Sequence, residues 1–462
     1  MRRLLALAAL PLLSACSAPR TVDSCILVVV DTLRADRLGT YGYARDTSPE
    51  LDRWAQRGVV FEEAFSTAPW TLPAFGTLFT GQLPSHHQAG ILVRPWRRAQ
   101  LPRWIPTLAE LAAREGLATA GFVSNPHLDQ RISRIGKGFE VWDNAIDGTQ
   151  FHPGRPMSEF RSADQAVDSA LGWLAERRRE RFLLVVHLLE PHWPQRPPAE
   201  HFERFAGREA RELLALADVE FAQTKSERLA APDPAVREGF RRGINDLYDA
   251  EVSFVDDQIG RFLDALGETG VLDRSLVLFT ADHGEELLER GEYDHGHSFF
   301  DELLRVPLIA WAPGVQPGRR GTAVSLLDVM PTVLDALQIE PPPSLPGLSL
   351  WPALRHREEL PERHLLADGT SSDPWDFAVI GPRYKLIVHE KATAFRLYDR
   401  RADPGERVDV ALREPREVRS LLRSARAALA EQRGGVAVEY PPDLVEKLRA
   451  LGYLGATGDE TE

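Results

Sequence analysis

Three short apolar runs constrain the fold of this chain more than any other feature. They are ILVVV at Ile26–Val30, FLLVVHLL at Phe182–Leu189 and LVLFT at Leu276–Thr280. None of them alternates between apolar and polar residues, as a strand with one face in water does. Continuous apolar strands are typical of parallel sheets whose two faces are both covered by helices. The runs therefore predict buried, mostly parallel strands.

Helical patterns lie between these runs. The segments TLAELAAREG, ending at Gly116, and VSFVDDQIGRFLDALGETG, ending at Gly270, both close on a glycine that suits a left-handed helix cap. Strands that alternate with helices indicate a doubly wound α/β fold, with a large, mostly parallel central sheet and helices on both of its faces. In such folds ligands bind beyond the carboxyl ends of the strands.

Two segments depart from this alternation. Phe202–Arg242 is polar and helical in pattern, which indicates an insertion near the rim. From Pro341 a proline-rich connection leads to VIGPRYKLIVHE and AFRLYDRRADPGE, which alternate like strands of an antiparallel sheet, and then to a helical pattern in DLVEKLRALGYLG. We therefore expect a signal peptide at 1–15, a main α/β domain over 16–345 with a helical insertion at 202–242, and a small α+β subdomain, an antiparallel sheet with a terminal helix, over 346–462.

The N-terminal stretch MRRLLALAALPLLSACSAPR has the features of an export signal: two arginines, a short apolar core and small residues before a cysteine. Its apolar core is too short to span a bilayer. LSAC, ending at Cys16, resembles the bacterial lipobox, in which the signal is removed before the cysteine and the cysteine is acylated. We therefore expect an exported lipoprotein of the bacterial cell envelope that faces the periplasm, and Ser17 favours the outer over the inner membrane. A plain secretory signal is the alternative. A lipid on Cys16 would leave Cys25 without a disulfide partner.

The charge balance argues against a nucleic-acid partner. The chain has 55 Lys and Arg against 68 Asp and Glu, a formal net charge of −13, whereas nucleic-acid binders usually carry a basic face. The basic run ERRRER at Glu176–Arg181 closes an apolar-periodic stretch. Cations are favoured at the C-terminus of a helix, so this run is interpreted as a solvated helix end. No motif indicates an oligomeric state.

Side chains that can bind a cation follow the three apolar runs. Because the carboxyl ends of parallel strands meet at one edge of a sheet, these side chains are expected to lie together and form a metal site. Two of these residue types also have a structural interpretation. An aspartate after a strand can cap a helix. A histidine inside an apolar run is typically a core residue with a backbone partner. The residues are Asp31 after the first run, His187, Glu190 and His192 at the end of the second, and Asp282 and His283 after the third.

Several separated motifs, in order, resemble those of the sulfatase family of the alkaline phosphatase superfamily. The first is VVDTLRADRLGTYGYARDTSPELDRWAQRGVVFEEAFSTAPWTLPAFGTLFTGQLPSHH, and the second is LFTADHGEELLERGEYDHGHSFFDELLRVPLIAWAPG. SLLDVMPTVLDAL and LYDRRADPGE match later landmarks. The resemblance runs from about Ile26 to the end of the chain. It implies an alkaline phosphatase-like sandwich and a metal-dependent ester hydrolase.

The resemblance also implies roles for individual residues. Thr71 lies at the nucleophile position, at the start of a helix whose N-terminus can receive an anion. One divalent metal ion, or two, would activate its hydroxyl. Histidine ligands favour zinc or manganese, while calcium or magnesium remain possible. The implied metal ligands are Asp31, Thr71, Asp282 and His283, with His192, His295 and His297 as candidates for a second ion, and the implied substrate contacts are Asn125 and Glu190.

The chain departs from the family pattern at the nucleophile. Sulfatases carry C-x-P-x-R, whose cysteine becomes formylglycine, whereas this chain has T-L-P-A-F from Thr71, with Phe75 at the arginine position. Thr32 replaces the acidic ligand that normally follows the first one. A formylglycine hydrate releases sulfate by collapsing to an aldehyde, and a threonine sulfate has no such route. A phosphothreonine can be cleared by metal-activated water. We therefore expect hydrolysis of phosphate monoesters or diesters, or of phosphonate esters, through Thr71.

Three alternatives remain open. One is a sulfuric ester hydrolase, as the family resemblance alone would suggest. Another is a transferase that moves a phospho-headgroup onto envelope glycans or lipids. The last is a lipoprotein that binds sulfated or phosphorylated glycans without turnover. In each case the expected partner is a small molecule or an envelope glycan or lipid ester.

Overall fold

The computed structural model of the chain describes residues 22–90, 92–94, 97–144, 161–193, 195–216, 224–225, 227–371, 376–389 and 394–432. Its core is a nine-stranded sheet in which the predicted apolar runs are the three neighbouring central strands. The strands in spatial order are β12 (Gly318–Arg320), β2 (Val59–Phe65), β11 (Arg305–Trp311), β8 (Ser275–Ala281), β1 (Ser24–Val30), β7 (Phe182–Leu188), β5 (Ala118–Phe122) and β6 (Val141–Asp143), with β13 (Val324–Ser325) also paired to β2.

The sheet is mostly parallel, as predicted. β1 runs parallel to both β7 and β8, so that Val28 lies between Val186 and Phe279. Every residue of these three strands is buried, which explains why none of them alternates between apolar and polar residues. β11 alone runs antiparallel to both of its neighbours, β8 and β2.

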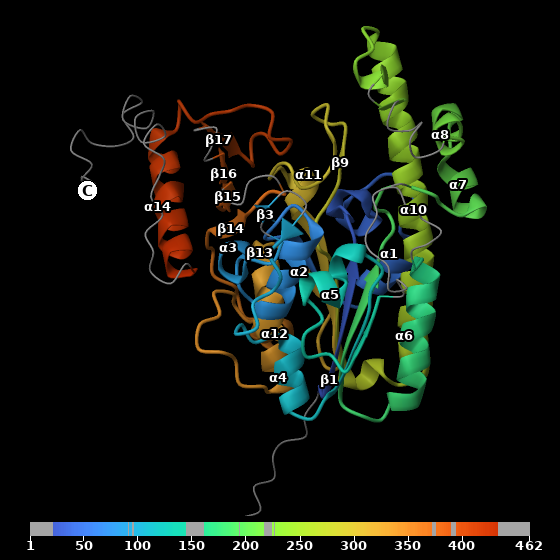
Figure 1. The fold of residues 1–462 in the computed structure, drawn as a ribbon, viewed down its shortest axis with the longest axis vertical. Helices are drawn as coiled ribbons and strands as arrows, with labels where there is room; N and C mark the ends of the chain where they lie inside the picture. Colours follow the sequence, from blue (N-terminus) through green and yellow to red (C-terminus); the bar gives the residue numbers. More distant parts are fainter. Residues whose placement is uncertain are drawn as a thin grey trace, which may run out of the picture.

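Helices cover both faces of the sheet (Figure 1). The predicted glycine caps are present, because Gly116 and Gly270 both adopt positive φ, 76° and 71°, just beyond helix ends. α7 (Ala199–Phe205) and α8 (Arg208–Leu214) pack against the long helix α10. One face carries α2 (Thr71–Thr80), α4 (Leu108–Arg114) and α12 (Val329–Leu337), and the other carries α1 (Pro49–Ala55), α6 (Ala163–Arg177) and α10 (Pro234–Glu268).

The C-terminal part forms a separate antiparallel sheet covered by one helix, as predicted from its alternating segments. The expected terminal helix in DLVEKLRALGYLG lies outside the described residues. The elements are β14 (Leu365–Asp368), β15 (Phe377–Ile380), β16 (Tyr384–His389), β17 (Ala394–Asp399) and α14 (Pro415–Gln432).

The remaining elements are short. The helices are α3 (Pro84–His87), α5 (Gln130–Ser133), α11 (Asp301–Leu304) and α13 (Trp351–His356), the strands are β3 (Leu92–Arg94), β4 (Arg97–Arg98), β9 (Glu286–Leu287) and β10 (Tyr293–Asp294), and the 3-10 turns are Ala35–Arg37, Gly39–Tyr41, Pro126–Leu128, Leu272–Arg274 and Leu326–Asp328.

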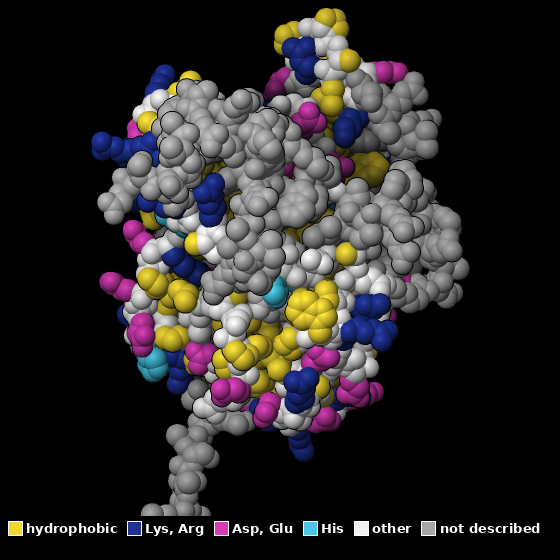
Figure 2. Space-filling model, turned by 60° about the vertical axis from the view of Figure 1, so that its left-hand side comes forward, with side chains coloured by type: hydrophobic (Ala, Val, Ile, Leu, Met, Phe, Trp, Pro, Cys, Tyr) yellow, Lys and Arg dark blue, Asp and Glu magenta, His cyan; other side chains and the backbone are white. Residues whose placement is uncertain are grey.

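The surface, the N-terminal region and Cys25 complete the description. On the face shown in Figure 2, described acidic and basic side chains are interspersed among hydrophobic ones. Among the described residues, no helix has the length and apolar character needed to cross a membrane. The expected signal peptide and Cys16 lie outside the described residues. Cys25 is a buried free cysteine in β1, and burial raises the pKa of its thiol.

Candidate functional site

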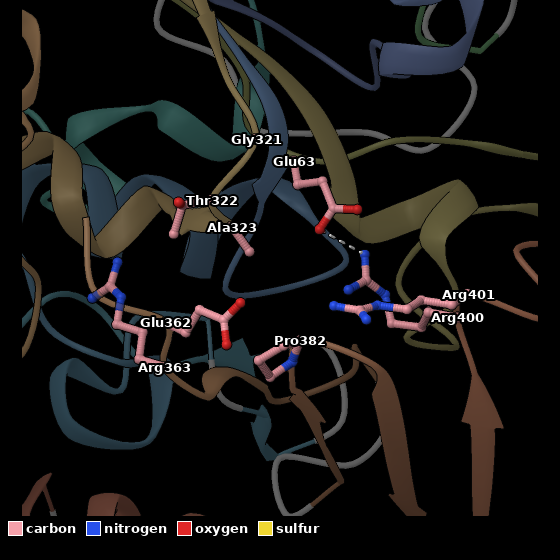
Figure 3. Close-up of a pocket in the computed structure, with 9 residues that line it drawn as sticks. All are labelled: Glu63, Gly321, Thr322, Ala323, Glu362, Arg363, Pro382, Arg400 and Arg401. Carbon is pink, nitrogen blue, oxygen red and sulfur yellow. Dashed lines mark ion pairs between the residues drawn. The ribbon is translucent and has the colours of Figure 1, made fainter. Parts of the chain in front are cut away.

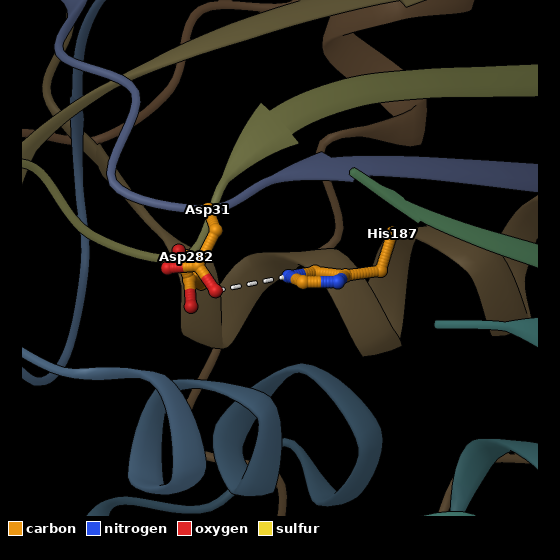
Figure 4. A group of neighbouring side chains, drawn as sticks. All are labelled: Asp31, His187 and Asp282. Atoms are coloured by element: carbon orange, nitrogen blue, oxygen red, sulfur yellow. Dashed lines mark ion pairs between the residues drawn. The ribbon is translucent and has the colours of Figure 1, made fainter. Parts of the chain in front are cut away.

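Three buried side chains meet at the carboxyl ends of the central strands (Figure 4). Asp31 follows β1 directly, Asp282 follows β8, and His187 lies near the end of β7. Each offers one ligand atom, and these atoms lie within 4.8 Å of one another. The structure thus brings the two predicted aspartates together and adds a histidine to them.

His187 has both a backbone partner and a place in the cluster. Its Nδ1 lies 3.3 Å from the backbone N–H of Ser124, which is the kind of contact expected of a core histidine. Its Nε2, however, lies 3.3 Å from Asp31 Oδ2. Interpreting His187 only as a core residue was therefore incomplete, because a histidine has two ring nitrogens that can face different partners.

His283 turns one ring nitrogen toward the same cluster. Its Nδ1 lies 2.9 Å from the carbonyl oxygen of Gly284, so this nitrogen carries the proton and donates it. The lone pair of Nε2 then points to the site, 3.6 Å from Asp31 Oδ1 and 3.4 Å from Asp282 Oδ2. This arrangement is typical of a metal-binding histidine whose orientation is fixed by its other nitrogen.

Thr71 is the first residue of α2 and is buried at the same place. Its Oγ1 lies 3.3 Å from His283 Nε2 and accepts a hydrogen bond of 3.3 Å from Asn125 Nδ2. Asn125 Nδ2 also donates to Asp31 Oδ2 at 2.6 Å. Asn125 therefore bridges the predicted nucleophile and a predicted metal ligand.

Thr32 holds a strained backbone conformation beside Asp31. Its φ is 55°, in the left-handed region, which costs a β-branched residue on the order of 1–3 kcal/mol. The conformation is held from both sides, because its N–H donates to Asp282 Oδ1 at 3.3 Å and its carbonyl accepts from the Tyr248 hydroxyl at 2.7 Å. Such strain is concentrated at functional sites. The sequence offered no signal for this conformation.

The buried carboxylates fit a divalent cation. Asp31 Oδ1 and Asp282 Oδ2 have no hydrogen-bond partner among the described residues. Burial and the neighbouring Asp31 raise the pKa of Asp282 well above its usual value. Burial of Asp31 acts in the same direction, but the charges of His192 and His187 lower its pKa below its usual value. Two adjacent buried carboxyl groups with free oxygens are costly unless a cation neutralises them, and two carboxylates with imidazole suit zinc or manganese.

A second group of possible ligands lies next to the first. The rings of His283 and His295 are 4.5 Å apart between centroids, and those of His295 and His192 are 5.0 Å apart. His295 Nδ1 lies 3.1 Å from both Glu285 Oε1 and Asp294 Oδ1. Ligand atoms of Glu285, Asp294 and His295 lie within 4.8 Å of one another. Burial lowers the pKa of His295, but Glu285 outweighs it and raises the pKa to about 10.

Sequence reasoning missed Glu285 and the hairpin that positions it. Strands β9 and β10 pair antiparallel, with Asp294 opposite Glu286. This hairpin brings the adjacent glutamates to the histidines that follow it: Glu285 to His295, and Glu286 Oε2 to His297 Nε2 at 2.9 Å. The sequence does contain a signal for these pairs: two adjacent glutamates follow DHG, and the motif HGH follows the turn. His297 is paired with Glu286, and its side chain is 34% exposed.

Glu190 has its hydrogen-bond partner outside the cluster, at the start of α6. Its Oε1 accepts the backbone N–H of Ala163, the first residue of α6, at 3.4 Å, and its Oε2 is buried without a partner among the described residues. Burial raises the pKa of Glu190 to about 7. Burial, together with the nearby Glu190, raises the pKa of Glu251 on α10. The structure therefore places Glu190 beside α6, and Asn125, the other predicted substrate contact, beside Thr71.

Comparisons with known proteins match both parts of the chain. A family model described as Sulfatase matches residues 24–339, and one described as N-sulphoglucosamine sulphohydrolase, C-terminal, matches residues 289–433. The uncharacterized sulfatase YidJ of Escherichia coli is 27% identical over 421 residues, covering 82% of this chain and 81% of its own length. The Delta 4,5-hexuronate-2-O-sulfatase of Bacteroides thetaiotaomicron is 25% identical over 413 residues, covering 84% of each.

Solved structures agree on the fold. A protein in complex with its substrate D-glucosamine-2-N,6-O-disulfate superposes with a TM-score of 0.70 at 20% identity, covering 89% of this chain and 98% of its own. The phosphonate monoester hydrolase of Silicibacter pomeroyi superposes with a TM-score of 0.68 at 21% identity, covering 90% and 96%. Since the Sulfatase match spans every strand of the central sheet and all three strand ends that build the cluster around Asp31, the chain belongs to the sulfatase family of the alkaline phosphatase-like superfamily.

Proposed function

We propose that this sulfatase-family hydrolase cleaves phosphorus esters, either phosphate monoesters and diesters or phosphonate esters, through a covalent intermediate on Thr71. The observation that carries the proposal is the position of the Thr71 hydroxyl, 3.3 Å from both His283 Nε2 and Asn125 Nδ2. No cysteine is available there for conversion to formylglycine.

The position of the family arginine supports the same proposal. Phe75 occupies it and is fully buried, with its ring 5.3 Å from that of His187 and 5.6 Å from that of Phe79. Among the described residues, the side chain at this position is therefore not the cation that contacts formylglycine in sulfatases. The candidate metal-binding cluster, of a kind that phosphoryl transfer also requires, is present.

In the proposed reaction Asp31, Asp282 and His283 would hold a divalent cation. The bound cation supplies Lewis-acid chemistry, lowering the pKa of a hydroxyl and neutralising charge on the ester. Asn125 orients the hydroxyl of Thr71. Thr71 Oγ1 then attacks phosphorus, the bond from phosphorus to the ester oxygen breaks, and the proton of the Thr71 hydroxyl ends on the leaving alcohol. Water next attacks the same phosphorus, the bond to Oγ1 breaks, and a proton of the water returns to Oγ1 as the acid is released. The N-terminus of α2 favours the negative charge.

A sulfuric ester hydrolase is the second candidate, because the similar proteins named above are mostly sulfatases. Their names also suggest a sulfated glycan as substrate. A phosphonate monoester hydrolase among the structures of the same fold favours the phosphorus-ester candidate.

The two candidates are separated by parallel assays on an aryl phosphate, an aryl phosphodiester, a phosphonate ester and an aryl sulfate, with zinc and manganese supplied separately. We expect turnover of at least one phosphorus ester, lost in Thr71→Ala. Turnover of the sulfate alone would contradict the proposal. Retained activity in Thr71→Ala would contradict the role of Thr71.

We also propose that the chain is an exported lipoprotein anchored through Cys16, on the strength of the LSAC motif. Metabolic labelling with radioactive palmitate should mark the wild-type chain and leave Cys16→Ser unlabelled. Equal labelling of the two chains would rule out Cys16 as the lipidated residue, and no labelling of either would favour a plain secretory signal.

A further inference from the structure

A hollow of about 180 Å³ lies where the edge of the central sheet meets the C-terminal sheet (Figure 3). Its walls include Glu63 of β2, the turn 321–323 after β12, Glu362, and Arg400 and Arg401 just after β17. β2 is three strands away from β1 in the sheet, which at about 4.8 Å per strand is roughly 14 Å. The hollow is therefore separate from the cluster around Asp31.

Arg400 is the most informative residue of this hollow. Its side chain is only 8% exposed, and its Nε is buried with no hydrogen-bond partner among the described residues. The rest of its guanidinium has loose contacts: Nη1 donates to the Gly381 carbonyl at 3.3 Å, and Nη2 lies 3.4 Å from Glu63 and 3.9 Å from Asp301. These ion-pair distances are longer than those of a close charge-assisted hydrogen bond, so the Nη2 group of Arg400 retains capacity to donate to a further acceptor in the hollow.

Two exposed charges face the same space. Arg401 follows Arg400 in the chain, and its guanidinium has no partner among the described residues. The carboxylate of Glu362, also without a partner in the described part of the chain, lies across the hollow from the two arginines (Figure 3). Arg363, by contrast, is already paired with Asp328. Arg401 is thus the cation of the hollow that remains without a partner among the described residues, beside the loosely paired Arg400.

We propose that this hollow is a second anion-binding site, in which Arg400 and Arg401 bind a sulfate, phosphate or carboxylate group. Adjacent guanidinium groups suit the paired oxygens of such anions. The anion would accept hydrogen bonds from the Arg401 guanidinium and from Nη2 of Arg400, would compete with Glu63 for the latter, and would be repelled by Glu362. Two sources of this chemistry are a second anionic group on a long substrate and a free inorganic anion. The proposal does not depend on which ester the cluster at Asp31 cleaves.

The test is a titration of the metal-loaded chain with inorganic sulfate at constant ionic strength, followed by TROSY NMR of the amides of residues 321–323. We expect saturable shifts in the wild type. Arg401→Gln should weaken binding at least about fivefold, because it removes a charged donor, and Glu362→Gln should tighten it about twofold, because it removes a like charge. Arg413→Gln, an exposed arginine outside the hollow, is the matched control and should have no effect.

Shifts that do not saturate, or equal affinities in the wild type and Arg401→Gln, would overturn the proposal. Kinetics then distinguish the two sources of the anion. If the site binds a distal group of the substrate, Arg401→Gln raises KM for an ester of a multiply sulfated oligosaccharide and leaves KM for a small aryl ester unchanged. If the site binds a free anion, KM is unchanged for both substrates while the loss of sulfate binding persists.

Discussion

Replacing Glu190 by glutamine should make the stability of the chain less sensitive to pH. The carboxyl group is buried between helices, accepts one N–H from Ala163 at 3.4 Å, and lies near the buried Glu251. Burial raises its pKa from 4.5 to about 7 in the folded chain. A carboxyl group whose pKa is higher in the folded than in the unfolded chain stabilises the fold fully at pH values below its unfolded-state pKa. This stabilisation is lost as the pH rises through its folded-state pKa.

The size of the effect follows from these two values. Between about pH 4.5 and 7 the folded chain keeps a proton that the unfolded chain releases, and each pH unit is worth about 1.4 kcal/mol. We therefore compare the difference in the free energy of unfolding between Glu190→Gln and the wild type at two pH values. This difference should be larger, in favour of the variant, at pH 8 than at pH 4 by on the order of 3 kcal/mol.

The measurement is urea unfolding of the metal-free chains across this pH range, with kcat/KM of the metal-loaded chains in parallel. A stability difference that stays flat from pH 4 to 8 would refute the assignment of a raised pKa. A collapse of kcat/KM with unchanged stability would instead return Glu190 to the role of a substrate contact.

Other substitutions test the cluster around Asp31. Asp282→Asn removes one of two adjacent buried carboxyl groups, so the metal-free chain should melt at a higher temperature while added zinc or manganese no longer raises the melting temperature; stabilisation by metal equal to that of the wild type would count against this ligand. Asn125→Ala removes the donor that bridges Asp31 and the nucleophile, and we expect kcat to fall about 10- to 100-fold with little change in KM; an unchanged kcat in steady-state assays would rule this out. Glu285→Gln should lower the pKa of His295 from about 10 in an imidazole NMR titration, whereas Glu285→Asp should largely retain it; equal values in the two variants would argue against the pairing.

The parts of the fold that follow from local patterns were predictable from sequence. Unbroken apolar runs identified the three central strands, and glycines such as Gly116 identified helix ends, because burial on both faces and left-handed caps each leave a direct mark on the sequence. Asp31 and Asp282 were predicted to meet because parallel neighbouring strands end at one edge of the sheet. These inferences required no knowledge of side-chain direction.

The remaining features depend on the direction in which individual side chains point. Glu190 and His187 lie within a few residues of each other, yet one carboxylate points toward α6 while the imidazole faces Asp31. The pairing of Glu285 with His295 requires the turn between β9 and β10, whose strands are two residues each. Strands this short have no hydrophobic period, so no sequence pattern could indicate their register.

The central claim, that Thr71 forms a covalent bond to phosphorus, is tested most directly by acid-quenching the chain during turnover of an aryl phosphonate ester and analysing its peptides by mass spectrometry. Phosphothreonine-type esters survive acid, so the account predicts that the peptide containing Thr71 gains the mass of the phosphonyl group in the first turnover. Thr71→Ala should release no aryl alcohol and gain no mass. An unmodified Thr71 during sustained turnover of the phosphorus ester, or turnover confined to sulfate esters, would contradict the account.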